Sequence, residues 1–492
     1  MRKPTLSNKK EQITMKSGKA FTLIFIVVVL LYGCNKKNVD ITHIKSLIDN
    51  GDFSKAERHI KTLLIETPSL SPTEKLELSF EIERMERIRK DFTKTREDVL
   101  QYIKKYIPDV KDQDIKRWEK EKSLEYMIID SKKWYFNQAA PNLFRINKEL
   151  RKIKEKVDGK RVRKFPLDKH IEEIVNTTLE TGENCVLPVR LRIKQSVVVK
   201  PGVVPENEMI RCWIPFPREI PGRQENIHII KTEPTRYILS DNLPQNTIYF
   251  EKPSCGDKPT EFWVEYTYTS YGFYKKINPE KVTEIKEANR ESLIPYLQEE
   301  PPHITFTDKI KRISNLIIGQ ETNPYRKAQK IFEWIDTNIP WASAREYSTI
   351  RNISDYCISN MHGDCGIQTI LFITLCRYNG IPARWQSGWE FQPPDDSMHD
   401  WGEVYFEPYG WVPVDVTYGL RNSRREEVKW FYLSGIDSYR LIFNDAYSQP
   451  FFPAKIYPRS ETVDSQRGEV EWRGGNLYFD KWDWKLEWEK LK

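Results

Sequence analysis

The segment 366–378 restricts the possible folds more than any other part of the sequence. Gly363-Asp364-Cys365 precedes it, and Asn379-Gly380 follows it as a typical helix C-terminal cap. Apolar residues lie on all sides of the helix that this segment would form: Ile367, Ile370, Leu371, Phe372, Ile373 and Leu375. A helix that is apolar all round is buried. We therefore expect a central helix with Cys365 at its first turn.

Three strands are predicted after this helix, at about 383–391, 400–406 and 411–416. The segment Glu407-Pro408-Tyr409-Gly410 supplies the turn between the last two. This hairpin would fold His399, at the start of one strand, toward Asp415 on the next. The fit is approximate and requires a bulge or a diagonal pairing.

The residue types of Cys365, His399 and Asp415 suit nucleophilic catalysis. The free N–H groups at a helix start favour a thiolate, so we expect a lowered pKa for Cys365. The thiolate needs a base, which His399 could provide while Asp415 orients the imidazole. Taken singly, each residue is more often an ordinary structural residue. Only the combination supports the hypothesis of a catalytic triad.

Metal binding is the alternative for the same region. Cys357, His362, Cys365 and Cys376 have the spacing C-x4-H-x2-C-x10-C. Because Cys376 falls inside the apolar helix and no CxxC pair exists, we predict neither a metal nor a cofactor.

Four short motifs resemble the transglutaminase-like superfamily. They are Gly363-Asp364-Cys365, Gly380-Ile381-Pro382-Ala383-Arg384, His399-Asp400-Trp401 and Gly410-Trp411-Val412-Pro413-Val414-Asp415. The resemblance implies an α+β, papain-like core, with Cys365 as nucleophile, His399 as base and Asp415 as its orienting partner. It also implies an oxyanion site, for which the backbone N–H of Cys365 is one candidate donor. The indole of Trp341 is a second by loose analogy, and core packing is the other interpretation of Trp341.

The chain upstream of this core divides into regions of different composition. Residues 40–165 are rich in charge and predict a helical domain, whose role the sequence leaves open. Residues 183–275 alternate apolar and polar side chains between Pro-rich turns, which is typical of an antiparallel β-sandwich. Residues 326–492 would form the transglutaminase-like catalytic domain with a C-terminal β extension.

The N-terminus resembles a bacterial lipoprotein signal peptide. Residues 21–32 are apolar, Lys16 and Lys19 precede them, and Leu31-Tyr32-Gly33-Cys34 follows. We expect residues 1–33 to be removed and Cys34 to be lipidated, which would anchor the protein on the extracytoplasmic side of a bacterial membrane, in the periplasm or at the cell surface. A simple secretory signal or short anchor is the alternative. Which membrane and which face carry the protein stays open.

Composition excludes several classes of protein. With 12% aromatic residues the chain is not disordered throughout, and its single long apolar run excludes a multi-span membrane protein. A net charge of +7 without a dense basic patch gives no support for nucleic-acid binding. Disulfides are permitted but not required, and Cys185 with Cys212 is a possible pair. The Trp-rich C-terminal part predicts a hairpin through Trp472, Trp482 and Trp484. Its rings either cover the core sheet or form a platform on which a sugar or peptide stacks.

The resemblance leaves the reaction open, because the superfamily includes crosslinking enzymes, peptidases, peptide N-glycanases and inactive members. We predict a cysteine hydrolase acting on a protein, peptide or glycopeptide substrate, since a transferase needs a dry acceptor channel that no sequence feature indicates. The alternatives are a protein-crosslinking transglutaminase and a catalytically idle binding or scaffold lipoprotein.

Overall fold

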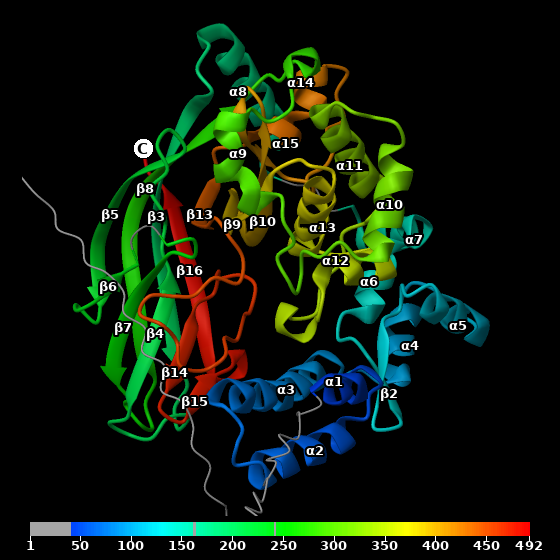
Figure 1. Ribbon diagram of the computed structural model, residues 1–492, viewed down its shortest axis with the longest axis vertical. Helices are drawn as coiled ribbons and strands as arrows, with labels where there is room; N and C mark the ends of the chain where they lie inside the picture. Colours follow the sequence, from blue (N-terminus) through cyan, green and yellow to red (C-terminus); the bar gives the residue numbers. More distant parts are fainter. Residues whose placement is uncertain (1–40, 161–163, 241–242) are drawn as a thin grey trace, which may run out of the picture. The chain divides into compact units, whose positions relative to one another are not determined.

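The computed structural model describes residues 41–160, 164–240 and 243–492. The first described region is built from helices, most of which bury apolar side chains (Figure 1). Ser71 caps one of them with a complete capping box, in which its side chain and that of Glu74 bond each other's backbone N–H. The helices are α1 (Ile41–Asp49), α2 (Phe53–Glu66), α3 (Pro72–Asp91), α4 (Arg96–Lys104), α5 (Asp112–Lys120), α6 (Ala139–Ile146) and α7 (Lys148–Asp158).

One feature of this region differs from the expectation of helices alone. A hairpin of β1 (Tyr126–Ile129) and β2 (Lys132–Tyr135) interrupts the helices, and Asp130 and Ser131 make its turn with φ of 46° and 69°. Asn147 caps α7 and separates it from α6. A further helix, α8 (Leu167–Thr181), precedes the sandwich.

Two antiparallel sheets form the predicted β-sandwich. The first has the order β12-β8-β3-β16, and β5 also pairs with β8. The second has the order β15-β14-β4-β7-β6. Their apolar faces share one core. The strands of the first sheet are β3 (Cys185–Val199), β5 (Gln224–Glu233), β8 (Thr260–Tyr274), β12 (Gly435–Ile436) and β16 (Trp482–Lys490), and those of the second are β4 (Met209–Pro215), β6 (Ile238–Leu239), β7 (Thr247–Pro253), β14 (Glu469–Trp472) and β15 (Gly475–Leu477).

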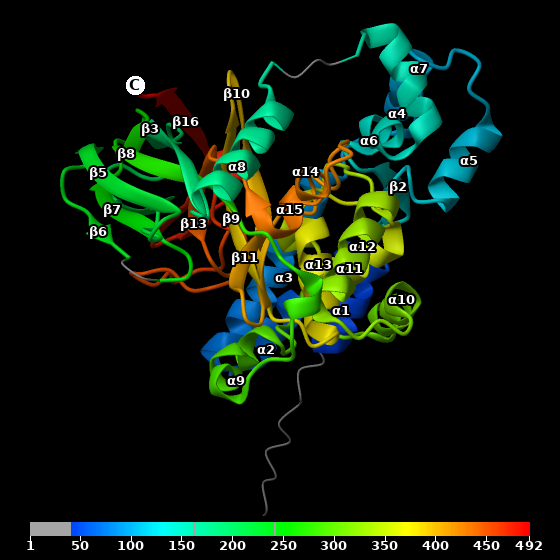
Figure 2. The same cartoon turned by 90° about the horizontal axis from the view of Figure 1, so that it is seen from above.

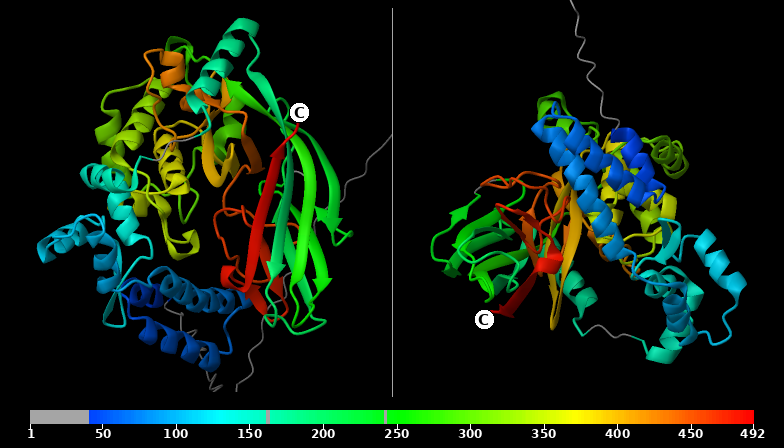
Figure 3. Two further views of the ribbon diagram at one scale, coloured as in Figure 1. Left: turned by 180° about the vertical axis from the view of Figure 1, so that it is seen from behind. Right: turned by 90° about the horizontal axis from the view of Figure 1, so that it is seen from below.

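The C-terminal strands therefore complete the sandwich. Strand β16 runs along β3, with Trp482 opposite Val199 and Lys490 opposite Leu191 (Figure 3). Strands β14 and β15 form the hairpin predicted at Trp472, but Trp482 and Trp484 lie on β16 in the other sheet. Trp482 is buried, whereas Trp484 is 37% exposed and contacts the ring of Trp389.

A four-stranded sheet with the order β11-β10-β9-β13 carries the motifs of the sequence analysis. Helix α13 is buried against it, as expected from its apolar surface (Figure 2). The strands are β9 (Ala383–Gln392), β10 (Asp395–Phe406), β11 (Gly410–Val414) and β13 (Arg440–Asn444), and the helices around them are α9 (Glu287–Leu293), α10 (Asp308–Ile318), α11 (Pro324–Asn338), α12 (Ile353–Asn360), α13 (Cys365–Tyr378), α14 (Glu426–Lys429) and α15 (Phe431–Ser434). The protein thus has the predicted α+β architecture.

The β10–β11 hairpin pairs without a bulge, with Gly402 opposite Val414 and Phe406 opposite Gly410. His399 lies within β10, not before it, because that strand begins at Asp395 and His399 pairs with Gly388 of β9. Asp415 follows the last residue of β11, so His399 and Asp415 meet diagonally.

Cys34 lies outside the described residues. Among those that are described, no helix is both long and apolar enough to cross a membrane. The described cysteines are all free thiols, Cys185 and Cys212 included.

Candidate active site

Cys365 is the first residue of α13, and two glycines near it, Gly363 and Gly366, have no space for a side chain. The Asp364 carboxylate caps the helix by accepting the backbone N–H of Ile367 at 3.1 Å. A Cβ at Gly363 would collide with Ile367. A Cβ at Gly366 would collide with the Tyr347 hydroxyl and lie 2.7 Å from Asp400 Oδ2. The glycines therefore let the thiol region pack closely against β10.

The hydrogen-bond partner of the Cys365 thiol is Asp400, the residue after His399. Cys365 Sγ lies 3.4 Å from Asp400 Oδ2. The Tyr347 hydroxyl lies 3.3 Å from the same oxygen and donates to Asp364 Oδ1 at 2.9 Å. Gln466 donates from Nε2 to Asp400 Oδ1 at 2.7 Å. Asp400 is thus held by an α-helix, a 3-10 turn and a C-terminal loop at once.

The surroundings of Cys365 correct the expectation of a lowered thiol pKa. Burial, followed by the charges of Asp400 and Asp364, raises the pKa of Cys365 well above its ordinary value. The favourable helix terminus is outweighed, because removing a thiolate from water and placing it beside carboxylates both oppose ionisation. In this arrangement the thiol is protonated at neutral pH.

A buried carboxyl pair lies behind the thiol. Burial and then Asp464 raise the pKa of Asp400 well above its ordinary value, and burial also raises the pKa of Asp464. Ser387 and Asn444 donate to Asp464 Oδ1 at 2.5 Å and 2.7 Å. Two carboxyls that share one site hold a proton between them, because both cannot ionise at low cost.

The predicted base and its orienting residue are in direct contact. His399 Nε2 lies 2.8 Å from Asp415 Oδ2, and both side chains are buried. The ring of His399 stacks on Trp401 and meets Tyr418 edge to face. Burial alone would lower the pKa of His399, but Asp415 and Glu390 outweigh it and raise the pKa. The pair therefore favours an imidazolium beside a carboxylate.

Arg440 on β13 is a member of this cluster that sequence reasoning missed. Its Nη1 lies 3.0 Å from Asp415 Oδ2, and its Nη2 lies 2.8 Å from Asp437 Oδ2. Burial would raise the pKa of Asp415, yet His399 and Arg440 together lower it. Arg440 keeps Asp415 ionised and fixes the carboxylate toward His399.

The structure brings His399 and Asp415 into contact, whereas the Cys365 thiol contacts Asp400, the residue that follows His399 on β10. Among the described residues there is no hydrogen bond between the Cys365 thiol and the His399 ring. No hydrogen bond to His399 Nδ1 is found in the described chain either, so in the neutral imidazole this nitrogen has a lone pair that can accept a proton. Asp400 belongs to the motif His399-Asp400-Trp401, but nothing in the sequence indicated that its carboxyl would face the thiol of Cys365.

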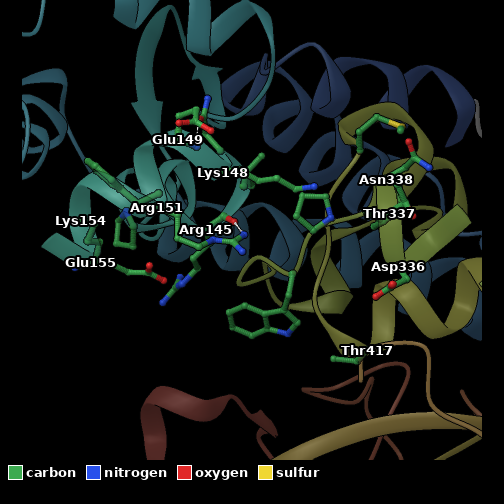
Figure 4. Close-up of a pocket in the computed structure, with 18 of the residues that line it drawn as sticks. Arg145, Lys148, Glu149, Arg151, Lys154, Glu155, Asp336, Thr337, Asn338 and Thr417 are labelled. Atoms are coloured by element: carbon green, nitrogen blue, oxygen red, sulfur yellow. Dashed lines mark hydrogen bonds between the residues drawn. The ribbon is translucent and has the colours of Figure 1, made fainter. Parts of the chain in front are cut away.

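Trp341 lies beside a cavity, and its indole makes no described contact with Cys365. The residue forms a parallel bridge with Gly363, and its side chain is 43% exposed. The cavity has a volume of about 1300 Å³ and extends to Gln368 of α13 and to Thr417 (Figure 4). The oxyanion role of Trp341 stays a prediction.

The alternative metal ligands do not converge. Cys357 and Cys376 are buried in the apolar core, and His362 Nε2 lies 3.3 Å from the carbonyl oxygen of Lys122. Within residues 41–160, 164–240 and 243–492, no cluster of three His, Cys, Asp or Glu side chains has the arrangement of a metal site.

Comparison with known proteins supports the family resemblance. Residues 311–416 match the model of the transglutaminase-like superfamily. YebA of Bacillus subtilis is 21% identical over 136 residues, which cover 24% of this chain and 18% of YebA. An uncharacterized protein of Haemophilus influenzae is 25% identical over 142 residues, which cover 23% of this chain and 37% of that protein. The chain thus spans well under half the length of these relatives.

The similarity to solved structures is weak. A Cytophaga hutchinsonii protein proposed to be a cysteine protease has a TM-score of 0.42 and 16% identity, covering 63% of this chain and 92% of that one. The periplasmic domain of TgpA from Pseudomonas aeruginosa has a TM-score of 0.25 and 14% identity, covering 53% of this chain and 94% of that one. The family match rests on the sequence model, and residues 311–416 of this chain form a core of the transglutaminase-like superfamily.

Proposed function

We propose that this protein is a cysteine hydrolase of the bacterial envelope that cleaves amide or peptide bonds. Cys365 is the nucleophile, His399 the general base and Asp415 the residue that orients the base. The observation that carries this proposal is the buried His399–Asp415 contact of 2.8 Å, in which no described hydrogen bond occupies His399 Nδ1.

The proposed reaction follows from the chemistry of these groups. The neutral form of His399 takes the thiol proton at Nδ1 as Cys365 Sγ attacks the carbonyl carbon of the scissile amide. The backbone N–H of Cys365 is placed at a helix start, where it can donate to the oxyanion. The imidazolium then gives its proton to the leaving amine, and a thioester remains. Water, deprotonated by His399, attacks the thioester and releases the acid and the thiol.

One side-chain movement is required before this reaction. The thiol must exchange its contact with Asp400 for a contact with His399, because beside Asp400 its pKa is raised. Substrate binding would supply this change if it separates the thiol from the carboxyl pair. Asp415 and Arg440 hold the imidazole in place meanwhile.

A catalytically idle binding protein is the second candidate. The contact between the Cys365 thiol and Asp400 favours it. A protonated thiol hydrogen-bonded to a carboxyl is unreactive, and a chain that keeps it there would retain the fold without turnover. The two candidates differ in whether Cys365 ever meets His399.

The decisive experiment compares the parent protein with Cys365→Ala on a bacterial envelope extract, with and without an added amine donor. New peptide termini that depend on Cys365 support hydrolysis, and new isopeptide bonds support crosslinking instead. A Cys255→Ala variant is the matched control, since Cys255 is an exposed free thiol outside this site. If parent and Cys365→Ala behave alike under both conditions, the idle candidate replaces the hydrolase.

The proposed location rests on the sequence Leu31-Tyr32-Gly33-Cys34. Cys34→Ser should release the protein from the membrane fraction or block its maturation, because the lipid is the proposed anchor. Fractionation and gel mobility measure both effects, and an unchanged pattern would contradict lipidation.

A further inference from the structure

The cavity beside Trp341 has two walls of different chemistry. One wall is formed by α6 and α7 of the helical region, and the other by the end of α11, the segment through Trp341, and residues near Thr417. Figure 4 shows Arg145, Lys148 and Arg151 on the first wall, across the cavity from Asp336 and Thr417.

Arg145 is a cation without a counterion. Its Nη1 donates to Asn142 Oδ1 and to Ser343 Oγ, both at 2.9 Å and both neutral. Its guanidinium lies 5.3 Å from the centre of the Trp341 ring. Among the described residues, no carboxylate lies within 4.0 Å of it. Burial lowers the pKa of Arg145, which shows that the charge is partly removed from water without compensation.

The rest of the lining is also more cationic than anionic once paired groups are set aside. Glu149 is paired with Lys152, and Asp158 with Lys154. In the described part of the chain, Lys148, Arg151 and Lys160 form no ion pair, and Glu155 and Asp336 are the lining carboxyls without one. A ligand carboxylate would therefore enter a net positive field.

The cavity floor is connected to the candidate nucleophile. Trp341 pairs with Gly363, two residues before Cys365, and the backbone N–H of Ala342 donates to Gly363 O at 2.9 Å. Gln368 lies on α13 one turn after Cys365, donates to Ile339 O at 2.8 Å, and accepts from Thr417 Oγ1 at 2.7 Å. A chain bound along this floor would approach the start of α13.

We propose that Arg145 and Trp341 form a substrate subsite for a carboxylate-bearing peptide. The guanidinium would bind the carboxylate through its remaining N–H groups, and the exposed part of the indole would contact the adjoining peptide. That the bound peptide is a substrate rests on the proposed hydrolase function. It gives the helical region a role, namely selection of acidic peptides.

Binding is measured in the full chain carrying Cys365→Ala, so that turnover does not interfere. The probes are a fluorescein-labelled, amidated alanine pentapeptide with one central glutamate and the same peptide with glutamine. We expect the glutamate peptide to bind about tenfold more tightly by fluorescence anisotropy, as one charge-assisted hydrogen bond predicts. Arg145→Gln should abolish this preference, and Arg145→Lys should reduce it because lysine lacks the planar fork.

Lys156→Gln is the matched control, since Lys156 lies on the same helix α7 as the cavity lining, is exposed and does not line the cavity. It should leave the preference intact. Equal affinity of the parent for both peptides, or a preference that survives both Arg145 substitutions, overturns the subsite. If the preference holds and follows Arg145 but the protein with intact Cys365 cleaves no peptide, the subsite stands and the proposed hydrolase fails.

Discussion

The reactivity of Cys365 is decided by competition between a helix terminus and carboxyl groups. A helix N-terminus contributes roughly half a positive charge, which favours a thiolate. Against it act burial of the thiol and the carboxyls of Asp400 and Asp364, both near Sγ. Position in the sequence therefore identified the nucleophile candidate but gave the wrong direction for its pKa.

Asp400→Asn should lower the pKa of Cys365, because it removes one of the charges that oppose the thiolate and keeps the size of the side chain. The measurement is the rate of iodoacetamide alkylation against pH, read by mass spectrometry of the Cys365 peptide. The exposed Cys255 serves as the internal standard. A midpoint for Cys365 that does not move in Asp400→Asn would show that Asp400 does not control the thiol.

His399 and Asp415 should act as one unit in catalysis. His399→Ala is expected to lower the rate by about 10²–10⁴-fold, the usual contribution of a general base. Asp415→Ala should cost less, and the double variant should lose little beyond His399→Ala, since Asp415 acts through the imidazole. Losses that multiply in the double variant, measured as kcat/KM, would contradict this coupling.

The same pair predicts a pH dependence of stability. The pKa of His399 is raised, so its stabilising contribution is complete below the ordinary value of 6.5 and is lost as pH rises through the raised pKa. The pKa of Asp415 is lowered, so its contribution is present above 3.8 and is lost as pH falls. Urea unfolding should show that His399→Gln costs more free energy near about pH 5.5 than near about pH 9. An equal cost at both values would mean that the imidazole is neutral in the folded protein.

At the scale of elements, the sequence predicted the parts whose signals are local. The apolar surface of α13 and the turn before Gly410 each depend on a few neighbouring residues, and the structure contains both. Two kinds of feature escaped prediction. The β1–β2 turn uses Asp130 and Ser131 at positive φ, where Asn-Gly is the usual signal.

The pairing of distant strands was the other feature that local patterns could not predict. The alternation of polar and apolar residues in β16 indicates a half-buried strand, yet nothing in it specifies β3 as its partner. The same holds for Gln466 and Asp464, which reach Asp400 from a loop far along the chain. Contacts of this kind are set by the packing of whole sheets, and their residues carry no spacing signal.

Strand β16 should contribute to stability through its first residue. Trp482 is 1% exposed, belongs to the sandwich core and donates from Nε1 to Leu477 O at 2.8 Å. Trp482→Ala should lower the free energy of unfolding by about 3–5 kcal/mol, as for other buried aromatic residues. Trp484→Ala, at a 37% exposed position of the same strand, is the control and should cost clearly less in thermal unfolding. Similar costs for the two would mean that β16 does not close the core.

At the scale of the whole molecule, the candidate site is held by segments from the helical region, the central sheet and the C-terminal loop. Asp400 of β10 accepts from Gln466, and the loop that carries Gln466 is bound in turn by α3. Arg87 of α3 donates to the carbonyl oxygens of Arg459 and Ser460 at 3.0 Å and 3.2 Å. The helical region thus binds the loop that holds Asp400, and it also lines the cavity beside Trp341.

Arg87→Met should therefore affect both stability and the thiol. Its side chain is 3% exposed, and its loss removes the donor of one buried and one half-buried carbonyl and the partner of the 39% exposed Glu83, so we expect a cost of about 1–3 kcal/mol. Because the loop would loosen, Gln466 should hold Asp400 less firmly and the alkylation rate of Cys365 should change at fixed pH.

Lys90→Met is the matched control, since Lys90 lies on the same helix in an exposed pair with Asp480, and such pairs contribute about 0–1 kcal/mol. Calorimetry and alkylation of both variants test the connection. A destabilised Arg87→Met protein whose Cys365 reacts as in the parent, at a temperature where both are folded, would show that α3 stabilises the fold without acting on the site.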